Sequence, residues 1–417
     1  MEQLKKQPSG LATLAIFAIY FLTMGIGTVT PALNSIIGYW GSQGEPVSNI
    51  LLVSTLPTLT MVVTMLIIGP LAGKKVKYKT LSILGCACFG LFGAMPAVFT
   101  SSFTFVLVCR ALFGVGLGLL APLGNALVLG LYEGDKQASY LGYGSLVMNL
   151  GGIILQLLGG ALSPSVATWN MCFWAHALGF VSMILCFFLP EPPKAPESPT
   201  GEKAKGKIPS YVWIASIMLF LLNLVNYALL MNSSVWVSFA VTDQTQVSFI
   251  AAIATSFFTV GGMISSAIFG KVFGKLGNKT LALGALCMAI GAILMFVCGS
   301  AWILIVIGFV FDGFGFCLVL PGVMAFVGMT TPLQSQAMGI SIVTAIMNLA
   351  GFVCTYYLIG IVAPIFQGMG HANDTTGYYY GEFIAAAVVF VVLAVVFFIH
   401  NPAKNALPPQ QKAPEEK

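Results

Sequence analysis

The sequence predicts an all-α membrane protein in which twelve transmembrane helices form two repeats of six. Three observations predict this fold class. Only 7% of the 417 residues are charged and 58% are hydrophobic, whereas about 25% of the residues in a typical soluble domain are charged. Long apolar runs recur along the whole chain, and a polar stretch near the middle divides them into equal sets. The second set repeats residues of the first at a nearly constant spacing.

The apolar runs have the length of membrane-spanning helices. A helix needs roughly 20 residues to cross a hydrocarbon core about 30 Å thick, and each run comes close to that length or exceeds it. The 46 glycines of the chain fit this class, because small residues let membrane helices approach closely. The expected spans are 11–33, 47–69, 80–99, 103–131, 138–162, 170–190, 210–232, 246–269, 280–300, 302–330, 336–366 and 383–400.

The lysines indicate how these spans are oriented. The chain contains one arginine, Arg110, and every lysine falls in a segment on the same side of the membrane when the spans alternate. Positive residues accumulate on the cytoplasmic side of membrane proteins. We therefore expect a multi-pass protein of the cell (cytoplasmic) membrane with both termini in the cytoplasm. The net charge of +5 reports this topology, and no nucleic-acid partner is expected.

A polar segment interrupts the chain after the sixth run. It reads PEPPKAPESPTGEKAKGKIPS from Pro190 to Ser210, and its proline, lysine and glutamate content cannot bury apolar surface. It therefore predicts a linker between the sets of spans. The expected organisation is an N-terminal six-helix half over 1–190, a cytoplasmic linker over 191–209, a C-terminal six-helix half over 210–400 and a cytoplasmic tail over 401–417.

The halves carry similar residues at corresponding positions. MNLGG contains Asn149 and MNLAG contains Asn348, 199 residues apart, and Pro122 and Pro321 stand at the same spacing. With six spans in each half, both halves enter the membrane from the same side. The repeats are therefore expected to be parallel and related by an axis along the membrane normal.

Three segments carry a family resemblance. The loop after the second span reads GPLAGKKVKYK from Gly69, its counterpart reads GKVFGKLGNK from Gly270, and the fourth span contains RALFGVG from Arg110. They resemble the signature loop G-x-L-A-D-R-x-G-R-K and the fourth-span pattern R-x-x-x-G-x-G of the major facilitator superfamily. The segment WNMCFW from Trp169 is similar to the entry of the sixth span in its drug:proton antiporter members. The resemblance implies the major facilitator fold.

The resemblance also implies that the loops after the second and eighth spans take part in gating. In both loops a glycine, Gly73 or Gly274, stands where the family has an aspartate that helps to close the cytoplasmic side. A cytoplasmic gate of the family's usual strength is therefore not expected from these loops. The expected gating residues are Gly69, Gly73, Lys74, Lys77, Gly270, Gly274, Lys275 and Gly277.

Ionisable side chains inside the spans are the first functional candidates, because a charge in hydrocarbon costs several kcal/mol. Well inside the spans stand Arg110, Asp312 and His176. The resemblance implies a central cavity between the first, fourth, seventh and tenth spans, so Arg110 and Asp312 are expected to face each other across it and to couple transport to protons. The alternative is a structural role for either residue. Glu382 follows three tyrosines, which are typical of the membrane interface, and is expected there.

Uncharged amides form a second group of candidates. Each amide in a span needs hydrogen-bond partners, which either a neighbouring helix or a substrate supplies. Both interpretations are open for the amides, whereas His176 is expected mainly to pack or hydrogen-bond within its half. The candidates for the substrate cavity are Asn34, Asn149, Asn226, Asn232, Asn348, Gln156 and His176, with Asn223 on the same span.

These features predict a secondary active transporter that works by alternating access and is coupled to protons. A cavity with many apolar groups, amides and one acid suits a small neutral, weakly cationic or amphiphilic molecule. The alternatives are an importer or exchanger of a small organic anion or metabolite, or a uniporter without proton coupling. The chain has no P-loop, so an ATP-driven pump is not expected. Its three histidines are scattered, so neither an enzyme nor a metal or other cofactor is expected. The expected partners are the substrate, the lipid bilayer and protons, and the expected state is a monomer.

Overall fold

The computed structural model describes residues 9–69, 71–73, 75–132, 134–192, 208–331, 333–366 and 375–400. Within these ranges the chain is almost entirely helical, and twelve helical units are long and apolar enough to cross a membrane. The expected fold class is therefore confirmed. Each expected span coincides with one of these units, although several ends differ.

The N-terminal half begins with a composite span. Its first part is α-helical, its middle is a 3-10 segment that contains Pro31, and its last part is α-helical again. The sixth span likewise enters through short 3-10 segments before α8. The elements are α1 (Gly10–Thr23), η1 (Gly25–Ala32), α2 (Leu33–Ser42), α3 (Val47–Ile68), α4 (Tyr78–Val98), α5 (Phe103–Leu120), α6 (Leu123–Leu131), α7 (Gly134–Leu162), η2 (Val166–Thr168), η3 (Met171–Ala177) and α8 (Leu178–Cys186).

The C-terminal half follows the same order. Its seventh span is broken at Asn232, and its eleventh contains a short π-helical segment. The elements are α9 (Ser210–Met231), α10 (Ser233–Ala240), η4 (Gln244–Gln246), α11 (Val247–Leu276), α12 (Lys279–Phe296), α13 (Ile303–Thr330), α14 (Leu333–Tyr357), η5 (Leu358–Val362), α15 (Ala363–Phe366) and α16 (Thr375–Ile399).

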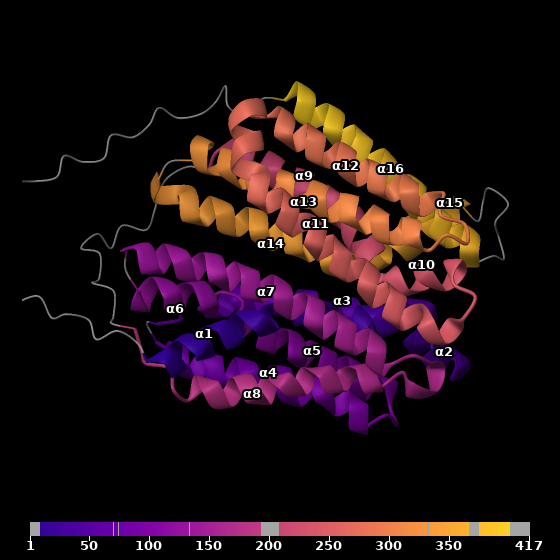
Figure 1. Ribbon diagram of the computed structural model, residues 1–417, viewed down its shortest axis with the longest axis horizontal. Coiled ribbons are helices and arrows are strands. Elements are labelled where there is room, and N and C mark those ends of the chain that lie inside the picture. Colours follow the sequence, from indigo (N-terminus) through magenta and orange to yellow (C-terminus); the bar gives the residue numbers. More distant parts are fainter. Residues whose placement is uncertain are drawn as a thin grey trace, which may run out of the picture.

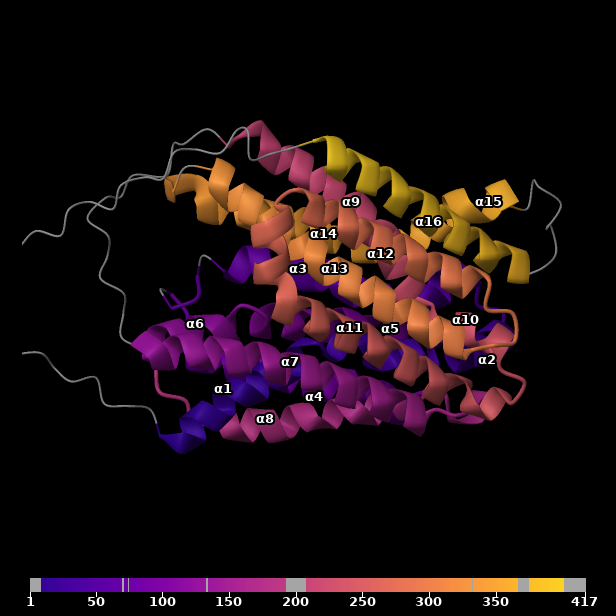
Figure 2. The same cartoon turned by 45° about the horizontal axis from the view of Figure 1, so that its top comes forward.

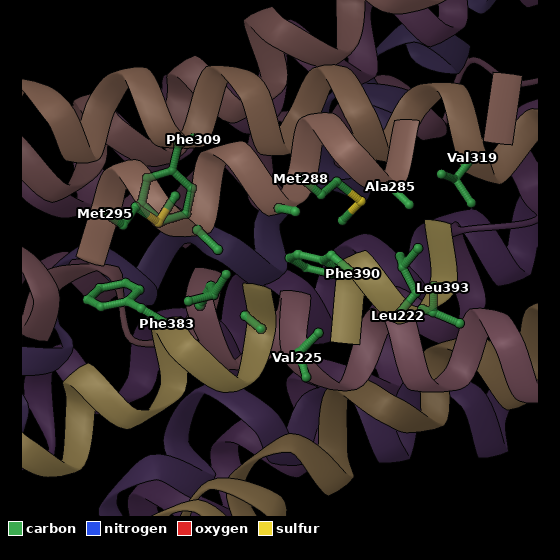
Figure 3. Packing of buried hydrophobic residues seen from close by; sticks show 14 of the residues in the cluster. Leu222, Val225, Ala285, Met288, Met295, Phe309, Val319, Phe383, Phe390 and Leu393 are labelled. Atoms are coloured by element: carbon green, nitrogen blue, oxygen red, sulfur yellow. The ribbon is translucent and has the colours of Figure 1, made fainter. Parts of the chain in front are cut away.

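The helices form two bundles that lie against each other (Figure 1). Turning the molecule shows α11 beside α7, and contacts also join α3 to α14 (Figure 2). Each bundle has its own buried apolar side chains. In the C-terminal bundle Leu222, Met288, Phe309 and Phe390 belong to one cluster (Figure 3), and the N-terminal bundle is built around residues such as Phe113.

Glycine contacts repeat from one bundle to the other. A β-carbon at Gly116 would lie 3.0 Å from the carbonyl oxygen of Gly85, and one at Gly315 would lie 2.2 Å from that of Gly284. Such distances leave no room for a side chain at the crossing of α5 with α4 or of α13 with α12. Gly116 and Gly315 are 199 residues apart, and so are Gly85 and Gly284. This is the spacing that relates Asn149 to Asn348. The repeat thus conserves a close helix crossing, as expected for membrane helices that associate by packing.

Three spans extend beyond their expected ends. The first continues through α2 to Ser42, the seventh through α10 to Ala240, and the eighth to Leu276. Polar residues near positions 34 and 232 resemble helix ends, but α2 and α10 follow directly after short breaks in these spans. The second expected gating loop is therefore largely helical, since Gly270, Gly274 and Lys275 belong to α11 and only Gly277 ends it, with φ +53°.

Candidate substrate cavity and buried charges

A cavity of about 240 Å³ lies between the bundles. The first, fifth, seventh, eighth and tenth spans supply its walls, which combine apolar side chains with amides and hydroxyls. None of the described residues that line it is charged. They are Met24, Ile26, Gly27, Thr30, Asn149, Gly152, Gln156, Asn223, Asn226, Tyr227, Leu230, Met231, Thr255, Phe258, Thr259, Gly262, Met263, Ser266, Phe316 and Cys317.

A second cavity of about 260 Å³ lies between α3, the start of α6 and α14. Asn348 lines it, and the Asn348 amide nitrogen donates to the Thr344 carbonyl oxygen at 3.0 Å. The Tyr227 hydroxyl donates to the other atom of the same amide, Oδ1, at 3.4 Å. Because Tyr227 lines the central cavity, this hydrogen bond joins the walls of the neighbouring cavities.

Four of the amides named from the sequence line the central cavity, namely Asn149, Gln156, Asn223 and Asn226. Asn223 and Asn226 lie on one face of α9, because residues three apart in a helix are neighbours. Both are almost completely buried, and the Asn223 amide nitrogen donates to the Leu219 carbonyl oxygen at 3.1 Å. The helix itself thus fixes how the Asn223 side chain points.

Asn34 and Asn232 do not line either cavity described above. They lie where the bundles touch at one end of the molecule, near α2 and α10 (Figure 1). The Asn34 backbone N–H donates to the Ser234 hydroxyl at 2.9 Å, and the Asn232 amide donates to the Ala228 carbonyl oxygen at 2.8 Å. The structure thus does not bring these two residues together with the amides that line the central cavity.

Further contacts close the same end. The hydroxyl oxygens of Thr55 on α3 and Thr355 on α14 lie 3.2 Å apart, and both residues are buried. The Thr30 hydroxyl donates to the Met231 sulfur at 3.6 Å. We call this end, defined by the contacts Asn34–Ser234 and Thr55–Thr355, the closed end. The opposite end holds Glu191 and Ser210, between which the linker runs, and we call it the linker end.

Arg110 is completely buried inside the N-terminal bundle. Its Nε donates to the Val53 carbonyl oxygen at 2.7 Å, and its guanidinium carbon lies 4.4 Å from the centre of the Phe113 ring. His176 belongs to the same group, since its ring lies 4.7 Å from that of Phe113 and its Nδ1 is 3.0 Å from the Phe173 carbonyl oxygen. Neither residue is among those that line the central cavity. His176 packs and hydrogen-bonds within its own half, which is its main expected role.

Asp312 is completely buried in the C-terminal bundle, and no hydrogen bond reaches either of its carboxylate oxygens in the described part of the chain. It packs beside Gly291 of α12. The expected pairing of Asp312 with Arg110 across the cavity is wrong, because the Arg110 side chain is held within its own bundle by Val53 and Phe113. Cys317, which lies within electrostatic range of Asp312, does line the cavity.

Glu382, expected at the membrane interface, is completely buried within the protein. The helix α16 begins at Thr375, which sets Glu382 about two turns inside it. Its carboxylate lies near Cys354 and Tyr357 of α14. The three preceding tyrosines indicated an interface, and nothing in the local sequence showed that the next turn faces α14.

The first expected gating loop contains one contact that the sequence did not reveal. Glu191, placed in the linker by its composition, accepts hydrogen bonds from the backbone N–H groups of Tyr78 at 2.7 Å and Lys79 at 3.2 Å. These groups open α4, where an anion is stabilised by the helix dipole. Gly73 adopts φ +73° against the Tyr78 ring, which favours glycine at that position. Gly69 ends α3 and Lys77 precedes α4, whereas Lys74 lies outside the described residues.

Two helical bundles with a cavity between them, closed at one end, define a membrane transporter. The family model of the Major Facilitator Superfamily matches residues 12–280 and 219–417. The chain therefore belongs to this superfamily. The resemblance that the loop and fourth-span motifs indicated is confirmed.

Relatives and solved structures agree with this assignment. The quinolone resistance protein NorA of Staphylococcus aureus is 24% identical over 365 residues, which cover 85% of this chain and 92% of NorA. The MFS-type transporter patC of Penicillium expansum is 24% identical over 371 residues, or 79% of this chain and 60% of patC.

Among solved structures, a bacterial homologue of the human lysosomal transporter Spinster, inward-facing and unoccupied, gives a TM-score of 0.74 at 17% identity, covering 96% of this chain and 98% of that one. The D-xylose-proton symporter gives 0.72 at 16% identity, covering 95% and 98%. At these identities the solved structures show the fold alone.

Proposed function

We propose that the protein is a secondary active transporter that moves a small neutral, weakly cationic or amphiphilic molecule by alternating access. The observation that carries the proposal is the central cavity, whose described lining combines apolar side chains with uncharged amides and hydroxyls. An organic anion would need cationic partners, and the arginine that the sequence offers is fixed elsewhere by Val53. The likeness to a quinolone resistance protein supports export of an aromatic compound.

The orientation belongs to the same proposal. Lysines place the linker end in the cytoplasm, so the closed end faces outward and the cavity is reached from the cytoplasm. Cysteines introduced at Lys203 and Lys412 should react with a membrane-impermeant maleimide only when the cytoplasmic face is exposed, as in inverted vesicles. Reaction of these cysteines in intact cells would show that the linker end faces outward, which contradicts the proposed orientation.

Proton coupling is assigned to Asp312 in this proposal. A carboxylate without partners is costly in an apolar interior, so Asp312 holds a proton while its surroundings are dry and releases it when water reaches the cavity wall at Cys317. The substrate and the proton then compete for binding to the same conformation of the transporter. Arg110 supports the N-terminal bundle and is not the partner of this acid.

The function is tested with the full-length protein in proteoliposomes. Aromatic amines, aromatic alcohols and aromatic carboxylates are offered separately, with and without an imposed pH gradient. The proposal expects amines or alcohols to accumulate against their gradient only when the pH gradient is present. Accumulation of carboxylates alone would favour the organic-anion alternative, and equilibration without a response to pH would favour a uniporter.

A further inference from the structure

Three residues that line the central cavity carry side-chain carbonyl oxygens without a hydrogen-bond partner in the described part of the chain. The side-chain oxygens of Asn223 and Asn226 on α9 and of Gln156 on α7 are buried and have no hydrogen-bond partner among the described residues. All three residues line the cavity. The exposed fractions of Asn223 and Asn226 are 0% and 1%.

The orientation of the Asn223 amide follows from its surroundings. Its nitrogen lies 3.1 Å from the Leu219 carbonyl oxygen, and a carbonyl oxygen accepts only from a donor. The nitrogen therefore stays on the helix, and Oδ1 is the atom left free. The same backbone bond is made by Asn232 and Asn348 to the residues four positions before them, so α9 and α14 use it repeatedly to hold asparagines.

Leaving a buried acceptor without a donor is destabilising, and native structures leave few such groups. Three unpaired acceptors among the residues that line one cavity indicate that a bound molecule supplies the missing hydrogen-bond donors. At Asn223, whose amide nitrogen is held by the Leu219 carbonyl oxygen, an acceptor-only guest such as a carboxylate would bring oxygen against oxygen. A cation without N–H groups would interact with the dipoles of the amide carbonyl groups but would donate no hydrogen bonds to their oxygens.

The size of the cavity limits the guest. Its volume of about 240 Å³ lies below the roughly 300–1,000 Å³ of sites for drug-sized ligands. The apolar part of the lining, with Met231, Phe258 and Phe316, suits one aromatic ring or a short alkyl chain. The donors of the guest must therefore be gathered in a compact head.

We propose that the cavity selects a compact aryl-alkyl primary amine, whose ammonium group donates its N–H bonds to Asn223, Asn226 and Gln156 while its ring lies against Phe258 and Phe316. This inference rests on the proposed function and narrows its substrate class. Carbonyl oxygens hold the cation as they hold ions in selective channels, by replacing its hydration shell. No carboxylate in the lining is needed.

Four probes with one body test the inference. They are 4-phenylbutylamine, its N,N,N-trimethylammonium counterpart, 4-phenylbutanol and 4-phenylbutyrate. Binding to the full-length protein in detergent is measured by microscale thermophoresis and by the shift in thermal midpoint. We expect the primary amine to bind at least tenfold more tightly than the trimethylammonium compound, which has the same charge and no donors, with the alcohol between them and the carboxylate weakest.

Variants separate the amides from the rest of the protein. Asn223→Leu and Asn226→Leu should each reduce the preference for the primary amine, and together they should abolish it. Asn232→Leu is the matched control, because it loses the same backbone bond on the same span outside the cavity lining, and it should keep the preference. Equal binding of the amine and its trimethylated form overturns the inference, as does a preference that survives in the double variant or no binding by any probe. If a variant fails to fold, the probe series on the unmodified protein still decides.

The same probes in proteoliposomes distinguish the inference from the proposed function. Donor-dependent binding without transport would leave the inference in place and refute the transport of this class. Transport of the four probes without a preference for donors would support the function and overturn the inference.

Discussion

At the scale of single residues, we expect Arg110 to contribute mainly to stability. Replacing it by alanine removes the bond to the Val53 carbonyl oxygen and the contact with the Phe113 ring, and leaves a buried void. The Arg110→Ala variant should lose about 2–4 kcal/mol of unfolding free energy, measured as a lower thermal midpoint in detergent. Arg110→Lys retains the charge but not the planar guanidinium that makes these contacts. Its thermal midpoint should lie between those of the parent and of the Ala variant. An Ala variant that melts like the parent yet does not transport would instead place Arg110 in the transport cycle.

Asp312 differs from Arg110 because neither of its carboxylate oxygens has a partner. The Asp312→Asn change removes the titratable group and preserves the shape. It should abolish accumulation driven by a pH gradient and leave exchange between equal substrate pools within about twofold of the parent. Both rates are measured in proteoliposomes.

Asp243 provides the control for that experiment. It is exposed before η4, and hydrogen bonds from Thr245 hold the pKa of its carboxyl below the usual value. A lowered pKa means that Asp243 is already ionised throughout the neutral range and binds no proton as the gradient is applied. Asp243→Asn should therefore transport like the parent. Normal gradient-driven accumulation by the Asp312→Asn protein would show that another group, or none, carries the proton.

At the scale of elements, the start of α4 depends on a residue that is distant in sequence. Glu191 accepts from the N–H groups of Tyr78 and Lys79. Glu191→Ala should destabilise this helix end by about 0.5–1 kcal/mol, and amide hydrogen exchange should become faster over residues 78–81. Glu191→Gln keeps an acceptor without the charge and should have a smaller effect. Unchanged exchange in the Ala variant would show that water replaces the carboxylate at no cost.

The same elements show how far sequence reasoning reaches. Apolar length predicted every span, because a bilayer requires satisfied backbone groups over a fixed thickness. It did not predict the ends at Ser42 and Ala240, because Asn34 and Asn232 look like helix termini until their partners in the folded protein are known. The direction of a side chain around a helix was equally hidden. Glu382 and Arg110 are ionisable in a span, but only the packing shows that both point away from the cavity.

At the scale of the whole molecule, the closed end should be a joint between the bundles. The hydroxyls of Thr55 and Thr355 are 3.2 Å apart, so cysteines at these positions come within reach of a disulfide after a small adjustment. The double variant Thr55→Cys/Thr355→Cys, in a Cys354→Ala background, should stop transporting when oxidised and recover when reduced. Thr55→Cys alone is the control. Undiminished transport by the oxidised double variant would mean that this end does not open.

The contacts at the closed end determine how much free energy is needed to open it. The contacts named there, Asn34–Ser234 and Thr55–Thr355, join neutral groups, and each such hydrogen bond contributes about 1 kcal/mol net. Since 1.4 kcal/mol changes a ratio of populations tenfold, a ligand that discriminates modestly between the states is enough to exchange them. Among the described residues, opening these two contacts separates no opposite charges, so ionic strength has little to screen there. The turnover rate should accordingly be the same in dilute and in concentrated salt.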